Sequence, residues 1–157
     1  TAAHVVDNPD SLLFIEAETG LYPAKAVYVD SGADLAVLTG SEDMRMKAIP
    51  LRKANQRDVK VGTDVVYSGF PNDAELLTIE GYIAGKHGRG FLYMHSYGWS
   101  GASGSSVFDK EGRLVGILVA LDVGPGIMGM PNIIEDVVIV VPIWLLDFSV
   151  LDKNLNQ

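Results

Sequence analysis

The chain has 157 residues, of which 48% are hydrophobic, so it is long enough for one globular domain or two small lobes with a buried core. Its formal net charge of -8 argues against a nucleic-acid-binding surface, because phosphate contacts need clustered lysine and arginine. It has no cysteine, which excludes disulfides, thiolate metal ligands and a cysteine nucleophile.

Short strand-like segments follow one another along almost the whole chain. Each is apolar or alternates apolar and polar residues, and each is bounded by glycine, proline or other turn residues. The expected strands are residues 12–16, 24–29, 35–38, 64–68, 77–84, 90–94, 106–108, 114–121 and 137–141. Residues 109–112 join two of them and are typical of a tight hairpin turn. Many short strands with regular turns favour an all-β barrel or sandwich.

Helical signals are few. One helical turn is expected after His4, and residues 142–148 are expected to form a short terminal helix with proline in its first turn. The longest apolar stretch, residues 136–150, is interrupted by Pro142 and Asp147, so no membrane-spanning helix is expected. The composition changes at about residues 48–60, which predicts a connector between two lobes, residues 1–57 and residues 58–157.

Three side chains far apart in the chain form a set that activates a serine nucleophile: His4, Asp34 and Ser103. A serine hydroxyl is a poor nucleophile at pH 7 unless an imidazole takes its proton and a carboxylate holds that imidazole in the right tautomer. Taken singly, each residue has an ordinary interpretation as a partly buried histidine, a turn aspartate or a turn serine between glycines. The surrounding motifs favour the catalytic interpretation.

These motifs resemble, in chain order, those of chymotrypsin-like (trypsin-like) serine peptidases, and most closely the HtrA-type protease domain. The matching segments are Thr-Ala-Ala-His-Val-Val at 1–6, Asp-Leu-Ala-Val-Leu at 34–38, Gly-Thr-Asp-Val-Val-Tyr-Ser-Gly-Phe-Pro at 62–71, Thr-Ile-Glu-Gly-Tyr-Ile at 78–83, Gly-Ala-Ser-Gly-Ser-Ser-Val-Phe-Asp at 101–109 and Gly-Arg-Leu-Val-Gly-Ile at 112–117. The resemblance implies an all-β fold of two packed six-stranded-type barrels, followed by a short C-terminal helix. The first barrel would carry His4 and Asp34, and the second would carry Ser103.

The resemblance also implies a role for each residue of the site. His4 would act as general base and then as general acid, and Asp34 would orient its ring. The backbone N–H groups of Gly101 and Ser103 would form the oxyanion hole. The chain would then be a serine endopeptidase that cleaves polypeptide through an acyl-enzyme. No cofactor is expected, and no histidine or carboxylate cluster has the spacing of a metal site.

Substrate recognition would fall on one strand and one loop. An extended peptide would pair with the strand edge at Val119, Ala120 and Leu121, so that backbone bonds hold it and side-chain pockets select it. Tyr97 would lie near the base of the primary specificity pocket, where an aromatic ring favours an apolar or small residue before the cut bond. Packing within the loop is the alternative interpretation of Tyr97.

Two departures from the family pattern concern the first barrel and activation. The family has one or two strands before its histidine motif, whereas this sequence begins at Thr1 inside that motif. The first barrel is therefore expected to lack its N-terminal strand or strands, so that either the sequence is a fragment or a partner strand completes the barrel. Ala102 stands where trypsin-type zymogens carry an aspartate that pairs with a newly cut N-terminus, so no such activation step is expected.

Two further departures lie near the nucleophile. Val119 stands where many relatives have a serine or threonine that bonds the aspartate, so Asp34 is expected to lack one supporting hydrogen bond, which would weaken catalysis. Ser105 and Ser106 replace a Gly-Pro pair but keep the turn. The alternative functions are a catalytically weak or inactive protease-fold protein with a binding or structural role, and an unrelated β-sandwich adaptor. The compartment stays open, with an extracytoplasmic or a viral context among the alternatives.

Overall fold

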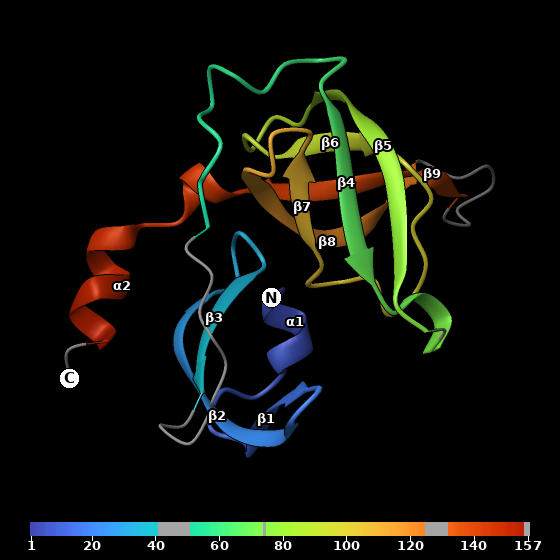
Figure 1. Cartoon of the computed structure of the whole chain (residues 1–157). Coiled ribbons are helices and arrows are strands. Elements are labelled where there is room, and N and C mark those ends of the chain that lie inside the picture. The colour runs from blue at the N-terminus through green and yellow to red at the C-terminus, as the bar shows by residue number, and fades with distance from the viewer. Residues whose placement is uncertain (41–50, 74, 125–131, 156–157) are drawn as a thin grey trace.

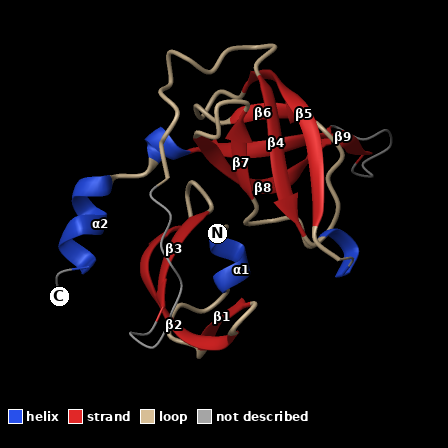
Figure 2. Ribbon diagram, viewed as in Figure 1, coloured by secondary structure: helices blue, strands red, loops and turns tan. Residues whose placement is uncertain are grey.

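The computed structural model describes residues 1–40, 51–73, 75–124 and 132–155 (Figure 1). Its elements are α1 (Ala3–Val6), β1 (Leu13–Ala17), β2 (Gly20–Asp30), β3 (Leu35–Gly40), β4 (Asp64–Gly69), η1 (Pro71–Asp73), β5 (Leu77–Lys86), β6 (Leu92–His95), β7 (Ser106–Asp109), β8 (Leu114–Gly124), β9 (Asn132–Pro142), η3 (Ile143–Leu145) and α2 (Phe148–Leu155). Every strand predicted from the sequence is confirmed, with ends that move by a few residues. The all-β architecture is evident in Figure 2.

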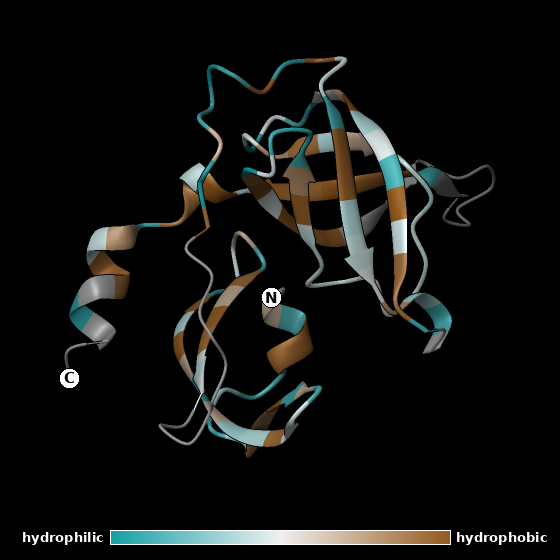
Figure 3. Cartoon of the chain, in the orientation of Figure 1, coloured by the Kyte–Doolittle hydropathy of each residue, from teal (hydrophilic) through white to brown (hydrophobic). Residues whose placement is uncertain are grey.

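Strands β4 to β9 close into a barrel in the order β4-β5-β6-β9-β8-β7, with every pair antiparallel. Successive side chains of a strand point to opposite faces, so each strand turns its apolar residues inward. An alternation of brown with paler or teal segments is visible along β5 in Figure 3. The interior is filled by large side chains: Tyr67, Ile83, Leu92, Met94, Val107, Val115, Val138 and Val140. The prediction of a six-stranded second barrel is confirmed.

The first lobe is a three-stranded antiparallel sheet in the order β1-β2-β3, and α1 packs against it. Its own core is small, because its buried residues are Ala3, Val6 and Ala36, with Leu13, Ala26 and Leu38 partly buried against them. The start of β3 pairs with the chain ahead of α1 through the bridge between Ala2 and Leu35. Past Ala36, β3 has no second neighbouring strand in the described part of the chain. Within the described residues, β3 therefore leaves an open sheet edge in the first lobe, as the sequence predicts.

A shared apolar cluster joins the two lobes. Ala2 and Leu35 of the first lobe pack in it with Ile117, Val119 and Val141 of the barrel. Burial of a valine, leucine or isoleucine side chain stabilises a fold by about 1.5–3 kcal/mol relative to exposure, so this apolar contact holds the lobes against each other. Side chains from the two lobes can therefore keep fixed positions relative to each other where the lobes meet.

The C-terminal helix starts later than the sequence predicts. Pro142 still belongs to β9, Ile143–Leu145 forms a single 3-10 turn, and α2 begins only at Phe148. The reason is Asp147, whose carboxylate accepts the N–H of Ser149 at 3.0 Å and so caps the first turn. The Ser149 hydroxyl donates to the same carboxylate at 2.6 Å, and this bond, with the N–H groups of Ser149 and Val150, lowers the pKa of Asp147. No described helix has the length and apolarity needed to cross a membrane.

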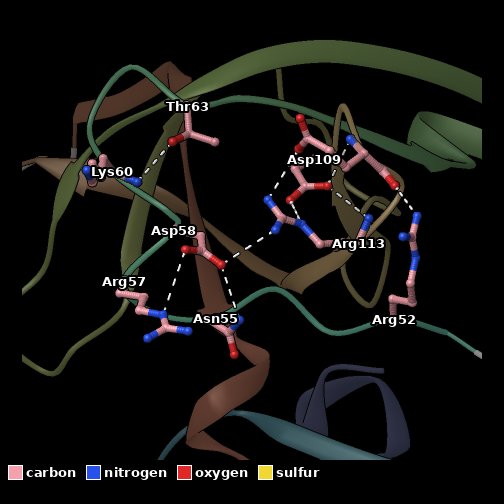
Figure 4. Close-up of polar contacts among 9 residues, drawn as sticks. Arg52, Asn55, Arg57, Asp58, Lys60, Thr63, Asp109 and Arg113 are labelled. Carbon is pink, nitrogen blue, oxygen red and sulfur yellow. Dashed lines mark hydrogen bonds and ion pairs between the residues drawn. The ribbon is translucent and has the colours of Figure 1, made fainter.

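A polar network fastens the connector to the barrel (Figure 4). Asp109 is 3% exposed and accepts the Nε–H of Arg113 at 2.8 Å, together with two backbone N–H groups of its own hairpin. Arg113 also lies 3.5 Å from the carboxylate of Asp58 in the connector. Arg52 donates to the carbonyl of Glu111 at 2.7 Å. The hairpin between β7 and β8 is thus clamped by the segment that links the two lobes.

Candidate active site

His4 and Asp34, predicted from motifs thirty residues apart, lie in direct contact in the first lobe. Asp34 Oδ2 lies 2.7 Å from His4 Nδ1, and Asp34 Oδ1 accepts the backbone N–H of His4 at 2.9 Å. A carboxylate only accepts hydrogen bonds, so Nδ1 carries a proton and Nε2 of the neutral ring is left as an acceptor. This is the tautomer that a general base toward a serine needs.

The local backbone explains why Asp34 reaches His4. Asp30 closes the preceding turn by accepting two of its backbone N–H groups at 2.9 and 3.0 Å. Asp34 then has φ = +54°, in the left-handed region that aspartate tolerates better than most residues. Its carbonyl accepts the N–H of Ala3 at 3.1 Å, while Ala36 donates to the carbonyl of Thr1 at 2.9 Å. The histidine segment and the start of β3 are therefore tied together by backbone bonds.

Ser103 lies in the loop between β6 and β7, where two glycines make the turn. Gly101 has φ = +88° and Gly104 has φ = +90°, both in the left-handed region that favours glycine. A Cβ added at Gly101 would lie 2.8 Å from the carbonyl oxygen of Phe70, and one at Gly104 would lie 2.5 Å from Thr1 Oγ1. The loop therefore needs glycine at both positions for its conformation and for close packing.

The two N–H groups predicted for the oxyanion hole have no acceptor in the described part of the chain. Their neighbours are bonded, since Ala102 donates to Trp99 at 3.1 Å and Gly104 donates to the carbonyl of Leu118 at 2.7 Å. Gly101 and Ser103 line a groove of about 370 Å³, together with residues that include Thr1, Phe70 and Ser106. Preorganised donors with no internal partner beside a groove are suited to stabilising a negatively charged oxygen.

The Ser103 hydroxyl makes no hydrogen bond with His4 in this structure. It donates to the backbone carbonyl of Val119 at 3.4 Å, and it makes no other hydrogen bond with a described residue. The Val119 side chain is 4% exposed and belongs to the shared apolar cluster. Among described groups, the Asp34 carboxylate accepts only from His4. The structure thus pairs two of the three predicted catalytic residues and sets the third on the facing lobe.

The loop ahead of the nucleophile presents a pair of aromatic rings. Tyr97 is 63% exposed and stacks on Trp99, with ring centroids 5.8 Å apart and planes 8° from parallel. Its carbonyl accepts the hydroxyl of Tyr67 at 2.7 Å. Burial raises the pKa of Tyr67, which keeps this hydroxyl protonated and able to donate. The sequence analysis does not predict the part played by Trp99. Its position two residues from Tyr97 in the same loop is the one local signal that the two rings could stack.

The remaining predicted substrate residues lie on β8. The backbone of Ala120 and Leu121 pairs with Ile139 and Val138 of β9, whereas their side chains lie outside the described part of the molecule. Strand β7 pairs with β8 only as far as Ile117. The backbone of Leu118 bonds with Gly104 and Ser105, so among the described residues the edge of β8 opposite β9 has no strand partner from Val119 onward.

The other histidines lie on the barrel surface. His95 stacks on Tyr82 with centroids 5.0 Å apart and lies 4.0 Å from Asp136, and His87 stacks on Phe91 at 5.8 Å. Within the described residues, no group of three or more histidine, aspartate and glutamate side chains is arranged to hold a metal ion.

Comparison with known proteins agrees with this architecture. The family model for the trypsin-like peptidase domain matches residues 1–117, and the chain belongs to that family. No match was found among curated proteins. The motif resemblance stated above is confirmed at the level of the family.

Solved structures with a similar fold include three proteases or protease relatives. A serine endoprotease from Yersinia pestis superposes with a TM-score of 0.74 at 22% identity, over 100% of this chain and 53% of that one. The HtrA-type protease AlgW with a decapeptide gives 0.76 at 22%, over 100% and 48%. An inactive form of Rv3671c from M. tuberculosis gives 0.73 at 19%, over 100% and 76%. The chain spans about half the length of the first two structures, and the chymotrypsin-like fold is confirmed.

Proposed function

We propose that this chain is a serine endopeptidase that uses His4, Asp34 and Ser103 on polypeptide substrates. The observation that carries the proposal is the double contact between Asp34 and His4, which holds the ring and leaves Nε2 as an acceptor. Family membership supports a peptidase, and an oxyanion site at Gly101 and Ser103 fits their free N–H groups. We further propose that residues 1–57 carry the base and residues 58–157 carry the nucleophile.

The chemistry follows from these positions. Ser103 Oγ forms a bond to the substrate carbonyl carbon as its proton passes to His4 Nε2, and the carbonyl π electrons move to the oxygen. The N–H groups of Gly101 and Ser103 stabilise that oxyanion. The carbon–nitrogen bond then breaks, the leaving amine takes the proton from His4, and an acyl-enzyme remains. Water then attacks the ester carbon as its proton passes to His4 Nε2. The bond from that carbon to Ser103 Oγ breaks, Oγ takes the proton back from His4, and the acid product leaves.

Substrate would be held as an added strand on β8. Pairing at Val119, Ala120 and Leu121 would supply backbone hydrogen bonds, and Tyr97 would favour an apolar or small residue before the cut bond. The edge of β8 from Val119 onward, which has no strand partner opposite β9 among the described residues, supports this arrangement. The related AlgW structure contains a decapeptide, which agrees with a peptide ligand for this fold.

Covalent labelling tests the proposed function. A fluorophosphonate reacts with an activated serine, so we expect the folded wild-type protein to gain one adduct, located at Ser103 by peptide mass spectrometry. The neighbouring Ser105 serves as the matched control, because Ser105→Ala should label as fast as the wild type. Folded protein that stays unlabelled, or an adduct at another serine, would favour the alternative of an inactive protease-fold binding protein.

We also propose that a partner strand completes the first lobe along β3. An apolar groove of about 280 Å³ runs beside this edge, between residues 35–38 on one side and Ile117, Ile143 and Leu146 on the other. An edge strand of apolar residues next to such a groove favours pairing with a further strand. The occupant would be an extended segment that contributes alternating apolar side chains.

Hydrogen exchange tests this pairing. In an edge strand alternate amides point away from the neighbouring strand and exchange quickly, whereas a second neighbour protects both sets. We expect every amide of Val37–Gly40 to be protected in the protein isolated with its partner segment. Fast exchange at alternate positions of β3, with β2 fully protected, would show that the edge stays open.

A further inference from the structure

The peptide group between Ser100 and Gly101 carries one of the two N–H groups proposed for the oxyanion site. A peptide group is planar and trans, so its C=O and its N–H point in opposite directions. The orientation of the Ser100 carbonyl therefore decides the direction of the Gly101 N–H. Gly101 itself does not fix this orientation, because glycine populates positive and negative φ about equally well. Another group has to hold the peptide in place.

The group that holds it is the backbone N–H of Asn72, which donates to the Ser100 carbonyl at 2.7 Å. Among described groups, no other donor is bonded to that carbonyl. The two backbones come this close because Gly101 has no side chain: a Cβ there would lie 2.8 Å from the carbonyl oxygen of Phe70 and 3.5 Å from Asn72 N. The Gly101 N–H, on the opposite side of the peptide, makes no hydrogen bond with a described residue.

Other hydrogen bonds tie down the loop on either side of this peptide. The carbonyl of Tyr97 accepts the hydroxyl of Tyr67 at 2.7 Å, and Tyr67 is fully buried in the barrel. The N–H of Ala102 donates to the carbonyl of Trp99 at 3.1 Å. These bonds do not involve Asn72. Loss of the Asn72 hydrogen bond would therefore act on one peptide group and leave the rest of the loop in place.

Asn72 reaches the Ser100 carbonyl through an unusual backbone conformation. It has φ = 51° and ψ = 40° within η1, which is the left-handed region. Asparagine tolerates this region and glycine adopts it freely, whereas β-branched residues are strongly disfavoured there. The Asn72 side chain is exposed and makes no hydrogen bond with a described residue. Its contribution to the loop therefore lies in its backbone.

We propose that Asn72 is a positioning residue for the oxyanion site. Its left-handed backbone directs its N–H at the Ser100 carbonyl and thereby turns the Gly101 N–H toward the reacting carbonyl of the substrate. Without this hydrogen bond the peptide is free to rotate, and loss of one oxyanion donor costs about 10²–10³ in rate. The inference rests on the proposed function and adds to it a residue outside the nucleophile loop.

Two substitutions at position 72 separate the backbone from the side chain. Asn72→Gly and Asn72→Val both remove the amide side chain, but glycine keeps the left-handed conformation and valine opposes it. A fluorophosphonate is the probe, because its phosphoryl oxygen gains negative charge in the same site as Ser103 attacks. The measured quantities are the labelling rate constant at saturating probe and the probe concentration that gives half of that rate.

We expect Asn72→Val to lower the saturated rate constant at least about tenfold and to change the half-saturating concentration less than about twofold. Asn72→Gly should stay within about twofold of the wild type in both quantities. Equal rate constants for the two variants, or a change confined to the half-saturating concentration, would overturn the inference while labelled wild-type protein leaves the proposed function standing. Wild-type protein that is not labelled at Ser103 would end both.

An ester in place of the amide at position 72 decides the question if Asn72→Val does not fold. The α-hydroxy analogue of asparagine, introduced by chemical ligation, keeps the side chain and replaces only the N–H by oxygen. Glycolic acid at position 112 is the matched control, because it removes the hydrogen bond from Gly112 to the Asp109 carbonyl at 3.0 Å in the hairpin between β7 and β8. The ester at 72 should slow labelling at least about tenfold and the ester at 112 less than about twofold. Equal slowing by the two esters, or none, would overturn the inference.

Discussion

Replacing Ser103 with alanine will lower peptide hydrolysis by on the order of 10⁵- to 10⁶-fold and will remove all fluorophosphonate labelling. Alanine has no oxygen to attack the carbonyl, so the acyl-enzyme cannot form and only the oxyanion site and substrate binding remain. Turnover is measured by mass spectrometry on an unstructured polypeptide such as reduced casein. The side chain removed is small and partly exposed, so the circular dichroism spectrum should match that of the wild type.

Ser105 again provides the comparison for turnover. It lies two residues away in the same loop, where its N–H donates to the carbonyl of Ala102 at 3.1 Å, a bond that alanine keeps. Ser105→Ala should therefore hydrolyse casein at close to the wild-type rate. If Ser103→Ala keeps more than about a hundredth of the activity, the proposed nucleophile is wrong, because removal of the attacking group costs far more than that.

Asp34→Asn will lower turnover by about 10⁴-fold and leave the fold unchanged. Asparagine tolerates the left-handed backbone at this position, so the strand start is kept. Its amide can donate a hydrogen bond to Nδ1, which moves the imidazole proton to Nε2 and leaves no base for Ser103. The measurement is kcat on the same substrate, with thermal unfolding to confirm that stability is retained.

Asp7→Asn is the matched control for charge. Asp7 lies three residues after His4, also at positive φ, and its carboxylate makes no hydrogen bond with a described residue. Removing this charge should change turnover by less than about twofold, because an exposed charge is screened by solvent and salt. Equal losses for Asp7→Asn and Asp34→Asn would mean that net charge, and not the orientation of His4, governs activity.

The sequence predicts the barrel well because its signals there are local. The short apolar run of β4, the alternation of apolar and polar residues in β5 and the turn at 109–112 each depend on a few neighbouring residues. The start of α2 also has a local signal, because an aspartate such as Asp147 is a common helix N-cap and accepts the N–H of Ser149 here. Pro142 instead ends β9, and the helix begins only after the cap at Asp147.

Other parts of the site depend on contacts that no local pattern reports. The pairing of β8 with β9 shifts in register between Leu118 and Ala120. No glycine or other turn residue at Val119 signals this irregularity in the sequence. The Ser103 side chain has several rotamers, and the one observed directs its hydroxyl to the backbone carbonyl of Val119, sixteen residues away. The Tyr97–Trp99 stack likewise requires the loop to bring two rings into parallel planes.

The small core of the first lobe has a consequence for heat stability. Ala3, Val6 and Ala36 offer little apolar area, whereas the barrel interior is filled by residues as large as Tyr67 and Met94. Segments with few enclosed side chains open at lower free energy than the rest of a protein. The base and its carboxylate would therefore be lost by partial melting while the nucleophile still sits on an intact scaffold. Amide hydrogen exchange that is faster in β3 than in β4 would demonstrate this earlier opening of the first lobe.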